Sequence, residues 1–199
     1  MKTVIAIEKT NLIETNEAYQ KILYWFFSFP NKEIGLSELA KELKISKTTA
    51  NKKINRLVKE GFLKKEIIGK SWRLSCNTNH IYNKSKKISY NLSMVYESGI
   101  VDKIIGRFNN AKAIVLFGSY RKGDDNEKSD IDIAVETLNE DLLFLLDTRI
   151  EEFVIIKKFG YRKDVKVNLY IFVRDKVNTN LFSNISNGIV INGFLEVKK

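Results

Sequence analysis

Two acidic residues at a spacing of two carry the clearest chemical signal in the sequence. Asp130 and Asp132 belong to the segment Ser129-Asp-Ile-Asp-Ile-Ala-Val135, in which polar and apolar residues alternate. Such alternation predicts a β-strand, and side chains two residues apart on a strand lie on the same face. Two carboxylates held that close repel each other unless a cation neutralises them, and Mg²⁺ prefers such oxygen ligands. We therefore predict that Asp130 and Asp132 are Mg²⁺ ligands.

A glycine and a serine end the apolar segment that precedes these acids. Residues 113–117 are continuously apolar, as expected for a buried strand, and Gly118 and Ser119 follow them. Glycine lets the backbone approach a ligand closely. If a helix begins after this turn, its free amide groups favour a phosphate there. The turn and the two carboxylates together predict a site for a phosphorylated ligand with Mg²⁺.

This arrangement resembles a known family. Gly118-Ser119 followed by Ser129-Asp-Ile-Asp132, between two apolar strands, is similar to the DNA polymerase beta superfamily of nucleotidyltransferases. The resemblance is narrower to the minimal nucleotidyltransferases of archaea and bacteria, and it covers roughly residues 98–199. It implies an α/β domain with a small mixed sheet.

The resemblance also implies a role for each motif residue. Asp130 and Asp132 are the implied catalytic residues, which hold Mg²⁺ and the triphosphate of a nucleotide, whereas Gly118, Ser119 and Ser129 bind the nucleotide. In such enzymes the metals stabilise charge on the attacking and leaving oxygens. A nucleoside monophosphate is transferred and pyrophosphate is lost.

One position departs from the family pattern. The family places a third carboxylate on a later strand, expected at residues 165–172 after an apolar helix over residues 142–154, and this sequence has Asn168 there. An amide is a poor ligand for a second Mg²⁺ and cannot accept the proton of an acceptor hydroxyl. Asp164 shares the strand face but lies about 13 Å away at about 3.3 Å per residue. Whether the domain catalyses transfer is therefore open.

The basic excess of the chain lies entirely in its first half. Residues 1–90 contain 18 Lys and Arg against 8 Asp and Glu, and residues 91–199 contain 16 against 16, which accounts for the net charge of +10. A polarised basic domain is typical of proteins that contact polyphosphate. Codon bias is the alternative explanation, but it should act on both halves alike.

The first half shows the element order of a winged helix-turn-helix. Apolar residues at helical spacing predict a helix over residues 19–27, a second helix is expected after Ser37 as N-cap, and a third is expected to end at Gly61. Two strand-like runs follow, residues 62–67 and 71–74. Residues 36–63 closely resemble the winged-helix family.

The third helix predicts a surface for double-stranded DNA. With Ala50, Ile54 and Leu57 inward, a rotation of about 100° per residue turns a polar set outward. Long cations there can reach phosphates or guanine, Asn can read adenine, and basic residues on the hairpin can clamp the backbone. The predicted DNA-binding residues are Lys47, Thr48, Thr49, Asn51, Lys52, Arg56, Lys70 and Arg73. The alternative is a solvated face used for protein contact.

The domain organisation follows from these patterns. We expect an α+β protein with a winged helix-turn-helix at residues 1–78, a linker at 79–97 and a nucleotidyltransferase-like domain at 98–199. The longest apolar run is far too short to span a membrane, so we expect a soluble, cytoplasmic protein. Winged-helix regulators often dimerise, and we therefore expect a homodimer by default. A single cysteine excludes an internal disulfide, and one histidine beside it excludes a zinc cluster.

Two functions from different classes remain open. The first is an enzyme that transfers a nucleoside monophosphate from a nucleoside triphosphate to a protein or nucleic-acid acceptor with Mg²⁺. The second is a DNA-binding transcriptional regulator whose second domain binds a nucleotide or a partner without turnover. By family analogy, the antitoxin of a toxin–antitoxin pair with a small helical partner protein is a further alternative.

Overall fold

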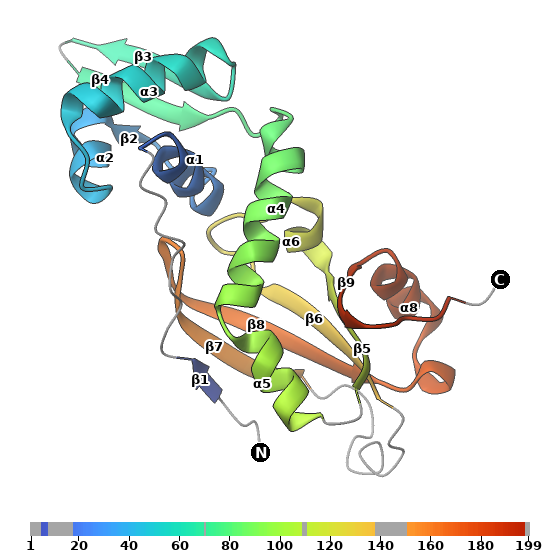
Figure 1. Ribbon diagram of the computed structural model, residues 1–199. Coiled ribbons are helices and arrows are strands. Elements are labelled where there is room, and N and C mark those ends of the chain that lie inside the picture. Colours follow the sequence, from blue (N-terminus) through green and yellow to red (C-terminus); the bar gives the residue numbers. More distant parts are fainter. Residues whose placement is uncertain (1–4, 8–17, 70, 109–110, 138–150, 198–199) are drawn as a thin grey trace.

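The computed structural model describes residues 5–7, 18–69, 71–108, 111–137 and 151–197 (Figure 1). A small helical part with a β-hairpin and a larger part built on a sheet are connected by one long helix, α4 (Tyr82–Glu97). The α+β class is therefore confirmed. No described helix is long and apolar enough to cross a membrane.

The N-terminal part has the helix and strand order that the sequence predicts. Its helices and strands are α1 (Ala18–Ser28), β2 (Ile34–Gly35), α2 (Leu36–Glu42), α3 (Lys47–Lys59), β3 (Leu63–Ile68) and β4 (Ser71–Cys76). The three strands form a sheet in the order β2-β4-β3, with β3 and β4 antiparallel. The hairpin strands extend slightly beyond the residues predicted for them.

The caps of the N-terminal helices are confirmed in part. Ser46 caps α3 by accepting a hydrogen bond from the backbone N–H of Thr49 at 3.0 Å, and Gly61 follows the helix with a φ of +81°. Ser37 was expected to cap α2, but this is wrong. Strand β2 runs directly into the helix, so Gly35 is the N-cap and Ser37 lies within the first turn.

The predicted linker at 79–97 consists largely of α4, which continues into α5 (Ile100–Arg107). The buried face of α4 recurs at helical spacing, so the description of this segment as a linker is incomplete. Half of the residues on this face are polar, so the pattern of apolar residues in the sequence did not predict it. The buried residues of α4 are Asn83, Lys87, Tyr90, Asn91, Met94 and Val95.

The larger part is a six-stranded mixed sheet in the order β1-β7-β8-β6-β5-β9. Strands β6 and β8 pair in parallel, as do β1 and β7, and the other pairs are antiparallel. The strands are β1 (Ile5–Ile7), β5 (Ala111–Phe117), β6 (Ile131–Thr137), β7 (Glu151–Phe159), β8 (Arg162–Phe172) and β9 (Ile189–Gly193). The helical elements of this part are α6 (Gly118–Lys122), η1 (Arg174–Lys176) and α8 (Thr179–Ser186).

Two predictions need correction here. The expected helix at 142–154 is wrong for residues 151–154, which belong to β7, while 142–150 lie outside the described residues. A short apolar run fits either structure, and the β-branched residues at 154–156 favour a strand paired with β8. In addition, β1 joins the edge of the second sheet although residues 1–78 were assigned to the first domain.

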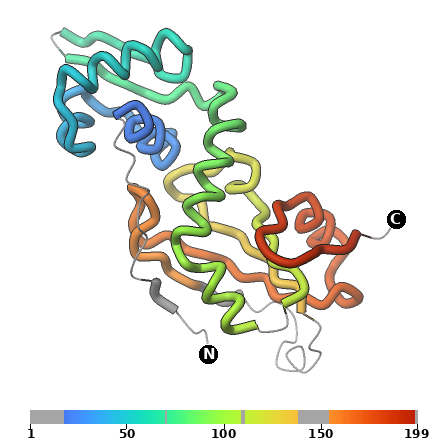
Figure 2. The backbone as a smooth tube through the Cα atoms, in the orientation of Figure 1, coloured from blue at the N-terminus to red at the C-terminus, as the bar shows by residue number. Residues whose placement is uncertain are grey.

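The cores of the two parts are continuous. Phe27 of α1, Tyr90 and Met94 of α4, and Tyr120 and Phe159 of the larger part belong to one buried apolar cluster. Figure 2 shows α4 running from the hairpin region down across the sheet, with α8 at the other side. A smaller cluster with Val115 and Ile185 packs under α8. Helix α4 therefore contributes to the core of the N-terminal part and to the core of the larger part, which form one cluster.

Candidate functional site

The turn after β5 lies beside the second acid of β6. Phe117 pairs with Asp132 across the antiparallel strands, so Gly118 begins α6 immediately next to the Asp132 carboxylate. Gly118 has a φ of +69°, and a Cβ there would overlap Asp132 Oδ2. Both constraints require glycine at this position. The structure thus brings together the glycine turn and Asp132, as the spacing in the sequence suggested.

Asp132 is held by two neighbours on β8. Asn168 is its partner in the parallel register and donates its Nδ2–H to Asp132 Oδ1 at 2.9 Å, and the Tyr170 hydroxyl also bonds to this carboxylate. Burial raises the pKa of Asp132; these two hydrogen bonds oppose the shift, and the nearby charge of Asp130 adds to it. Charge on Asp132 is therefore costly until a cation or further donor approaches.

The first acid has a basic partner. Lys166 Nζ lies 3.4 Å from Asp130 Oδ2, and both side chains are partly exposed. Asp164, the alternative third acid, instead pairs with Lys157 at 3.0 Å and is exposed. Its distance along the strand and its own partner leave Asn168 as the residue beside Asp132. The sequence placed Asn168 correctly but gave no signal for Lys166 or Tyr170.

The two predicted serine ligands differ in their surroundings. Ser119 lies in α6 directly after Gly118, and its carbonyl accepts the N–H of Gly123. Ser129 closes the loop before β6, because its Oγ accepts the N–H of Asn126 at 3.0 Å. A hydroxyl accepting this bond can still donate its proton. Nucleotide binding by either serine stays a prediction.

The oxygen donors at this site fit one Mg²⁺. Asp130 and Asp132 provide carboxylates, and Asn168 Oδ1 is buried without a hydrogen-bond partner among the described residues. Hard cations accept carboxylate and amide oxygens. Among all the residues that the structure describes, no group of three or more His, Cys, Asp or Glu residues could hold a metal ion. These carboxylate and amide oxygens are of the kind that a hard cation binds, and the binding of Mg²⁺ and of a nucleotide stays a prediction.

The outer face of α3 is the candidate DNA interface. Lys47, Thr48 and Lys52 are exposed on this helix. Thr49 belongs to the helix cap, where its hydroxyl also accepts the Ser46 hydroxyl at 2.8 Å. Lys70 lies outside the described residues. Exposed cations occur in both halves of the helix, with Arg56 and Lys59 in its C-terminal half. In helix-turn-helix proteins the N-terminal residues of this helix contact base edges.

A chain of polar contacts connects α3 to the hairpin. Lys65 Nζ donates to Asn55 Oδ1 at 3.1 Å, and Asn55 Nδ2 donates to Asn51 Oδ1 at 2.6 Å. The amide oxygen of Asn51 thus accepts one hydrogen bond from Asn55, and its second lone pair and its N–H groups have no partner in these contacts. The spacing of exposed residues did not identify Asn55 or Lys65, whose side chains orient Asn51.

Two predicted DNA-binding arginines are engaged in contacts within the protein. Arg56 Nε lies 2.8 Å from Glu60 Oε1, and its guanidinium stacks over the Tyr19 ring at 4.7 Å. Arg73 on β4 lies 3.2 Å from Glu33. Both remain exposed. Arg56, near the end of α3, is therefore fixed on the side of α1 rather than extended freely from the helix.

Comparisons with known proteins identify both modules. Residues 99–187 match the nucleotidyltransferase domain family, and residues 31–64 match the family of winged helix-turn-helix DNA-binding domains. The chain thus carries a DNA-binding winged helix-turn-helix and a nucleotidyltransferase domain.

Comparisons over longer stretches add little. No curated protein matches the sequence. Among solved structures, the chain is similar to a Sulfolobus solfataricus protein whose own assignment as a nucleotidyltransferase is provisional. The identity is 16% over 59% of this chain and 93% of that chain, with a TM-score of 0.29. This likeness carries no argument about function.

Proposed function

We propose that this protein is a DNA-binding regulator whose nucleotidyltransferase domain binds a nucleoside triphosphate with Mg²⁺ but does not transfer it efficiently. The observation that carries the proposal is the place of Asn168. It pairs in register with Asp132 and donates a hydrogen bond to it, at the position where the family resemblance implies a third carboxylate.

The chemistry of an amide explains why binding and transfer separate. A carboxylate at residue 168 could accept the proton of an attacking hydroxyl and ligate a second metal ion, whereas an amide accepts no proton near neutral pH. Asp130 and Asp132 would still hold one Mg²⁺, which screens phosphate charge, and the turn at Gly118 would still face the phosphates. Asp164 cannot replace the missing base because it lies about 13 Å from residue 168 along the strand.

The DNA-binding part of the proposal is supported by the exposed cations of α3. Lys47 and Lys52 form no ion pair with an acid among the described residues, and Lys64 on the hairpin strand β3 is also exposed. Contacts to phosphates position such a helix, and polar residues such as Asn51 supply base contacts. Salt-sensitive DNA binding is the expected signature.

Nucleotide transfer is the second candidate. The observation that favours it is the close approach of Gly118 to Asp132, which leaves no room for a Cβ at residue 118. In this case the acceptor oxygen bonds to the α-phosphorus, pyrophosphate leaves, and the hydroxyl proton passes to solvent. The acceptor would be a hydroxyl of a protein or nucleic acid.

Calorimetric titration with ATP, GTP, CTP and UTP in the presence of Mg²⁺ tests the proposed binding. We expect at least one nucleotide to bind the native protein and binding to be lost in Asp132→Asn. Asp124→Asn, an exposed acid in the same loop, is the matched control and should bind normally. Absence of binding for all four nucleotides would refute the proposed function, and DNA binding would be measured separately.

A further inference from the structure

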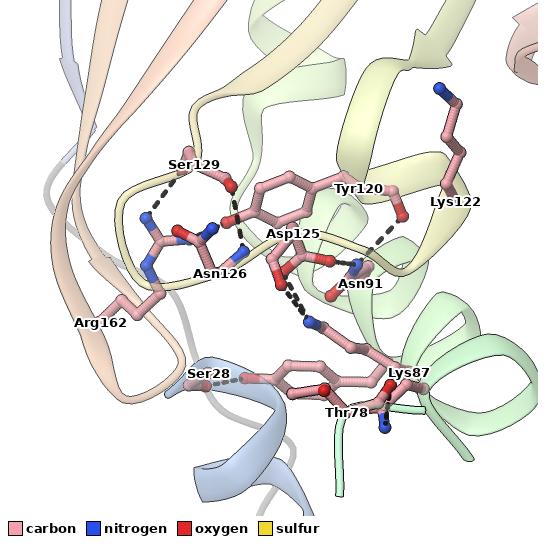
Figure 3. A network of polar contacts seen from close by, with 12 residues as sticks. Ser28, Thr78, Lys87, Asn91, Tyr120, Lys122, Asp125, Asn126, Ser129 and Arg162 are labelled. Atoms are coloured by element: carbon pink, nitrogen blue, oxygen red, sulfur yellow. Dashed lines mark hydrogen bonds and ion pairs between the residues drawn. The ribbon is translucent and has the colours of Figure 1, made fainter. Parts of the chain in front are cut away.

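A buried lysine of α4 reaches into the nucleotidyltransferase domain. Lys87 is 1% exposed, and its Nζ donates to the carbonyl of Asp125 and lies 3.3 Å from the Asp125 carboxylate (Figure 3). Asp125 is itself 4% exposed. Burial lowers the pKa of Lys87 and raises the pKa of Asp125, while the opposite charges favour ionisation of both. Lysine and aspartate are rarely this buried unless they are paired, as they are here.

A second residue of α4 holds the same segment. Asn91 Nδ2 donates to the Tyr120 carbonyl at 3.0 Å and to Asp125 Oδ1 at 2.7 Å. Tyr120 directly follows the Gly118-Ser119 turn, and Asp125 precedes the two acids of β6 by a few residues. We call residues 118–130 the site loop. Its two ends carry the candidate nucleotide ligands, and its middle is bound to α4.

The sheet fixes the site loop from the other side. Arg162 at the start of β8 donates to the Ser129 carbonyl at 2.8 Å and to the Tyr120 hydroxyl. Gly123 in the same loop has a φ of +73°, and a Cβ there would overlap the carbonyl of Asn83 in α4. In Figure 3 the side chains of α4 and β8 converge on the loop from two directions. The loop therefore has little freedom to move without α4.

The same helix is attached to the DNA-binding part. Tyr82 at its start donates to Glu60 at the end of α3 at 3.2 Å, and Tyr90 stacks on Tyr24 of α1 with ring centroids 4.5 Å apart. The Tyr90 hydroxyl also lies 3.0 Å from the Ser28 hydroxyl. One rigid helix thus contacts α1, α3 and the site loop.

We propose that Lys87 and Asn91 are positioning residues of the nucleotide site, and that α4 couples nucleotide binding at the site loop to DNA binding by α3. The inference rests on the proposed function. Both residues precede the segment that matches the nucleotidyltransferase family, residues 99–187. The site loop is therefore completed by a helix that the winged part shares, and a ligand that shifts the loop shifts α4 with it.

Thermodynamic linkage requires the effects of nucleotide and DNA on each other's affinity to be reciprocal. If a nucleotide changes the DNA affinity by some factor, DNA changes the nucleotide affinity by the same factor, typically about 5- to 150-fold for coupled sites. A salt bridge kept only for stability could be replaced by neutral residues of similar volume with little loss. Coupling is thus the property that separates a positioning role from a structural one.

The test compares the native protein with a neutral double variant, Lys87→Met with Asp125→Asn. This pair leaves no buried charge unpaired and keeps an acceptor for Asn91. Ser89→Ala is the matched control, because Ser89 is exposed on the same helix and its hydroxyl donates only to the Ser85 carbonyl within α4. Cooperative thermal unfolding of each variant establishes that it folds. Asn91→Ala serves as an independent second variant if the double variant unfolds.

Fluorescence anisotropy would measure the affinity for a labelled duplex, selected from a random-sequence pool, with and without Mg²⁺ and each of the four nucleotides. We expect at least about a fivefold change in the native protein and in Ser89→Ala. The double variant should bind the duplex alone as tightly as the native protein, with the nucleotide effect reduced to less than about twofold.

Two outcomes overturn the coupling. One is a native protein that binds nucleotide and DNA with no mutual effect, and the other is full coupling in both the double variant and Asn91→Ala. If calorimetry detects no nucleotide binding to the native protein, the proposed function fails first, and the coupling fails with it. Separate measurement of the two ligands distinguishes these cases.

Discussion

Asn168 lies opposite Asp132 in the parallel pair of β8 and β6 and donates its amide N–H to the Asp132 carboxylate at 2.9 Å. The amide therefore does what a metal-bridging carboxylate could not do, because it stabilises the negative charge on Asp132 when no cation is present. Its own carbonyl oxygen remains buried without a partner among the described residues. In the proposed function, this pairing is the reason why the domain binds a nucleotide but does not transfer it efficiently.

Replacement of Asn168 by aspartate should make stability depend on Mg²⁺. In Asn168→Asp a second carboxylate faces Asp132, so without Mg²⁺ the repulsion and the lost hydrogen bond should lower the free energy of unfolding by about 1–3 kcal/mol. Added Mg²⁺ should restore much of this loss. Thermal unfolding with and without Mg²⁺ measures the effect, and Asn168→Ser is the neutral control. An equal response to Mg²⁺ in both variants would contradict this arrangement of the site.

Gly118→Ala should disrupt the nucleotide site. The added Cβ overlaps Asp132 Oδ2, and the φ of +69° is unfavourable for alanine by about 1–2 kcal/mol. We expect nucleotide affinity to fall at least about tenfold in calorimetry. Gly106→Ala in α5 is the matched control, because its Cβ meets no atom within 4 Å. In a helix this change should stabilise the protein by about 0.5–1 kcal/mol. Equal nucleotide affinities in the two variants would exclude contact between the turn and the ligand.

Lys52→Ala should weaken DNA binding in a salt-dependent way. Its exposed ammonium group on α3 is expected to contact a phosphate, so its loss should lower the affinity for different duplexes alike. The slope of log affinity against log salt should decrease by about one. Lys41→Ala on α2 removes the same charge away from α3 and should leave the slope unchanged. A duplex-independent loss of the same size in Lys41→Ala would indicate only a general charge effect.

Glu60→Gln should remove stability at neutral pH and little in acid. Partial burial pushes the pKa of Glu60 upward, but hydrogen bonds from Tyr19, Arg56 and Tyr82 outweigh it, so the pKa lies below its ordinary value. The ionised group therefore stabilises the fold above the ordinary glutamate pKa, and this stabilisation is lost as the pH falls through the lower folded-state pKa.

Urea unfolding at a series of pH values measures this difference between the native protein and Glu60→Gln. We expect about 1 kcal/mol at neutral pH, which narrows toward zero in acid. Glu66→Gln, an exposed acid on the hairpin, should show no such trend. If the difference in the free energy of unfolding did not depend on pH, the charge of the Glu60 carboxylate would contribute nothing to the stability of the contacts between α1, α3 and α4.

The features that the sequence predicted correctly are those with a strong local pattern. Helical spacing of large apolar residues predicted α1 and α3, and a continuous run followed by an alternating one predicted β5 and β6. The spacing of Asp130 and Asp132 was read from the alternating pattern, whereas Asn168 was identified from the resemblance to the nucleotidyltransferase family. These local patterns depend on neighbours in the chain, so sequence alone contains them.

The features that it missed depend on contacts between distant residues. The buried face of α4 includes the polar residues Asn83, Lys87 and Asn91. The partners of Lys87 and Asn91 lie in the site loop, whereas Asn83 donates to carbonyls within residues 77–80. A short apolar run alone did not distinguish β7 from a helix, and its pairing with β8 decides for a strand. The homodimer and the roles of the DNA-binding residues stay predictions, because they concern partners outside this chain.

The most direct test of the account is pyrophosphate release from labelled nucleoside triphosphates with Mg²⁺, measured for the native protein and Asn168→Asp, with and without duplex DNA. We predict that the native protein binds nucleotide but releases pyrophosphate at the rate of the Asp132→Asn variant, and that Asn168→Asp releases it faster. Release by the native protein that Asp132→Asn abolishes would contradict the account and establish a nucleotidyltransferase that works with Asn168 in place.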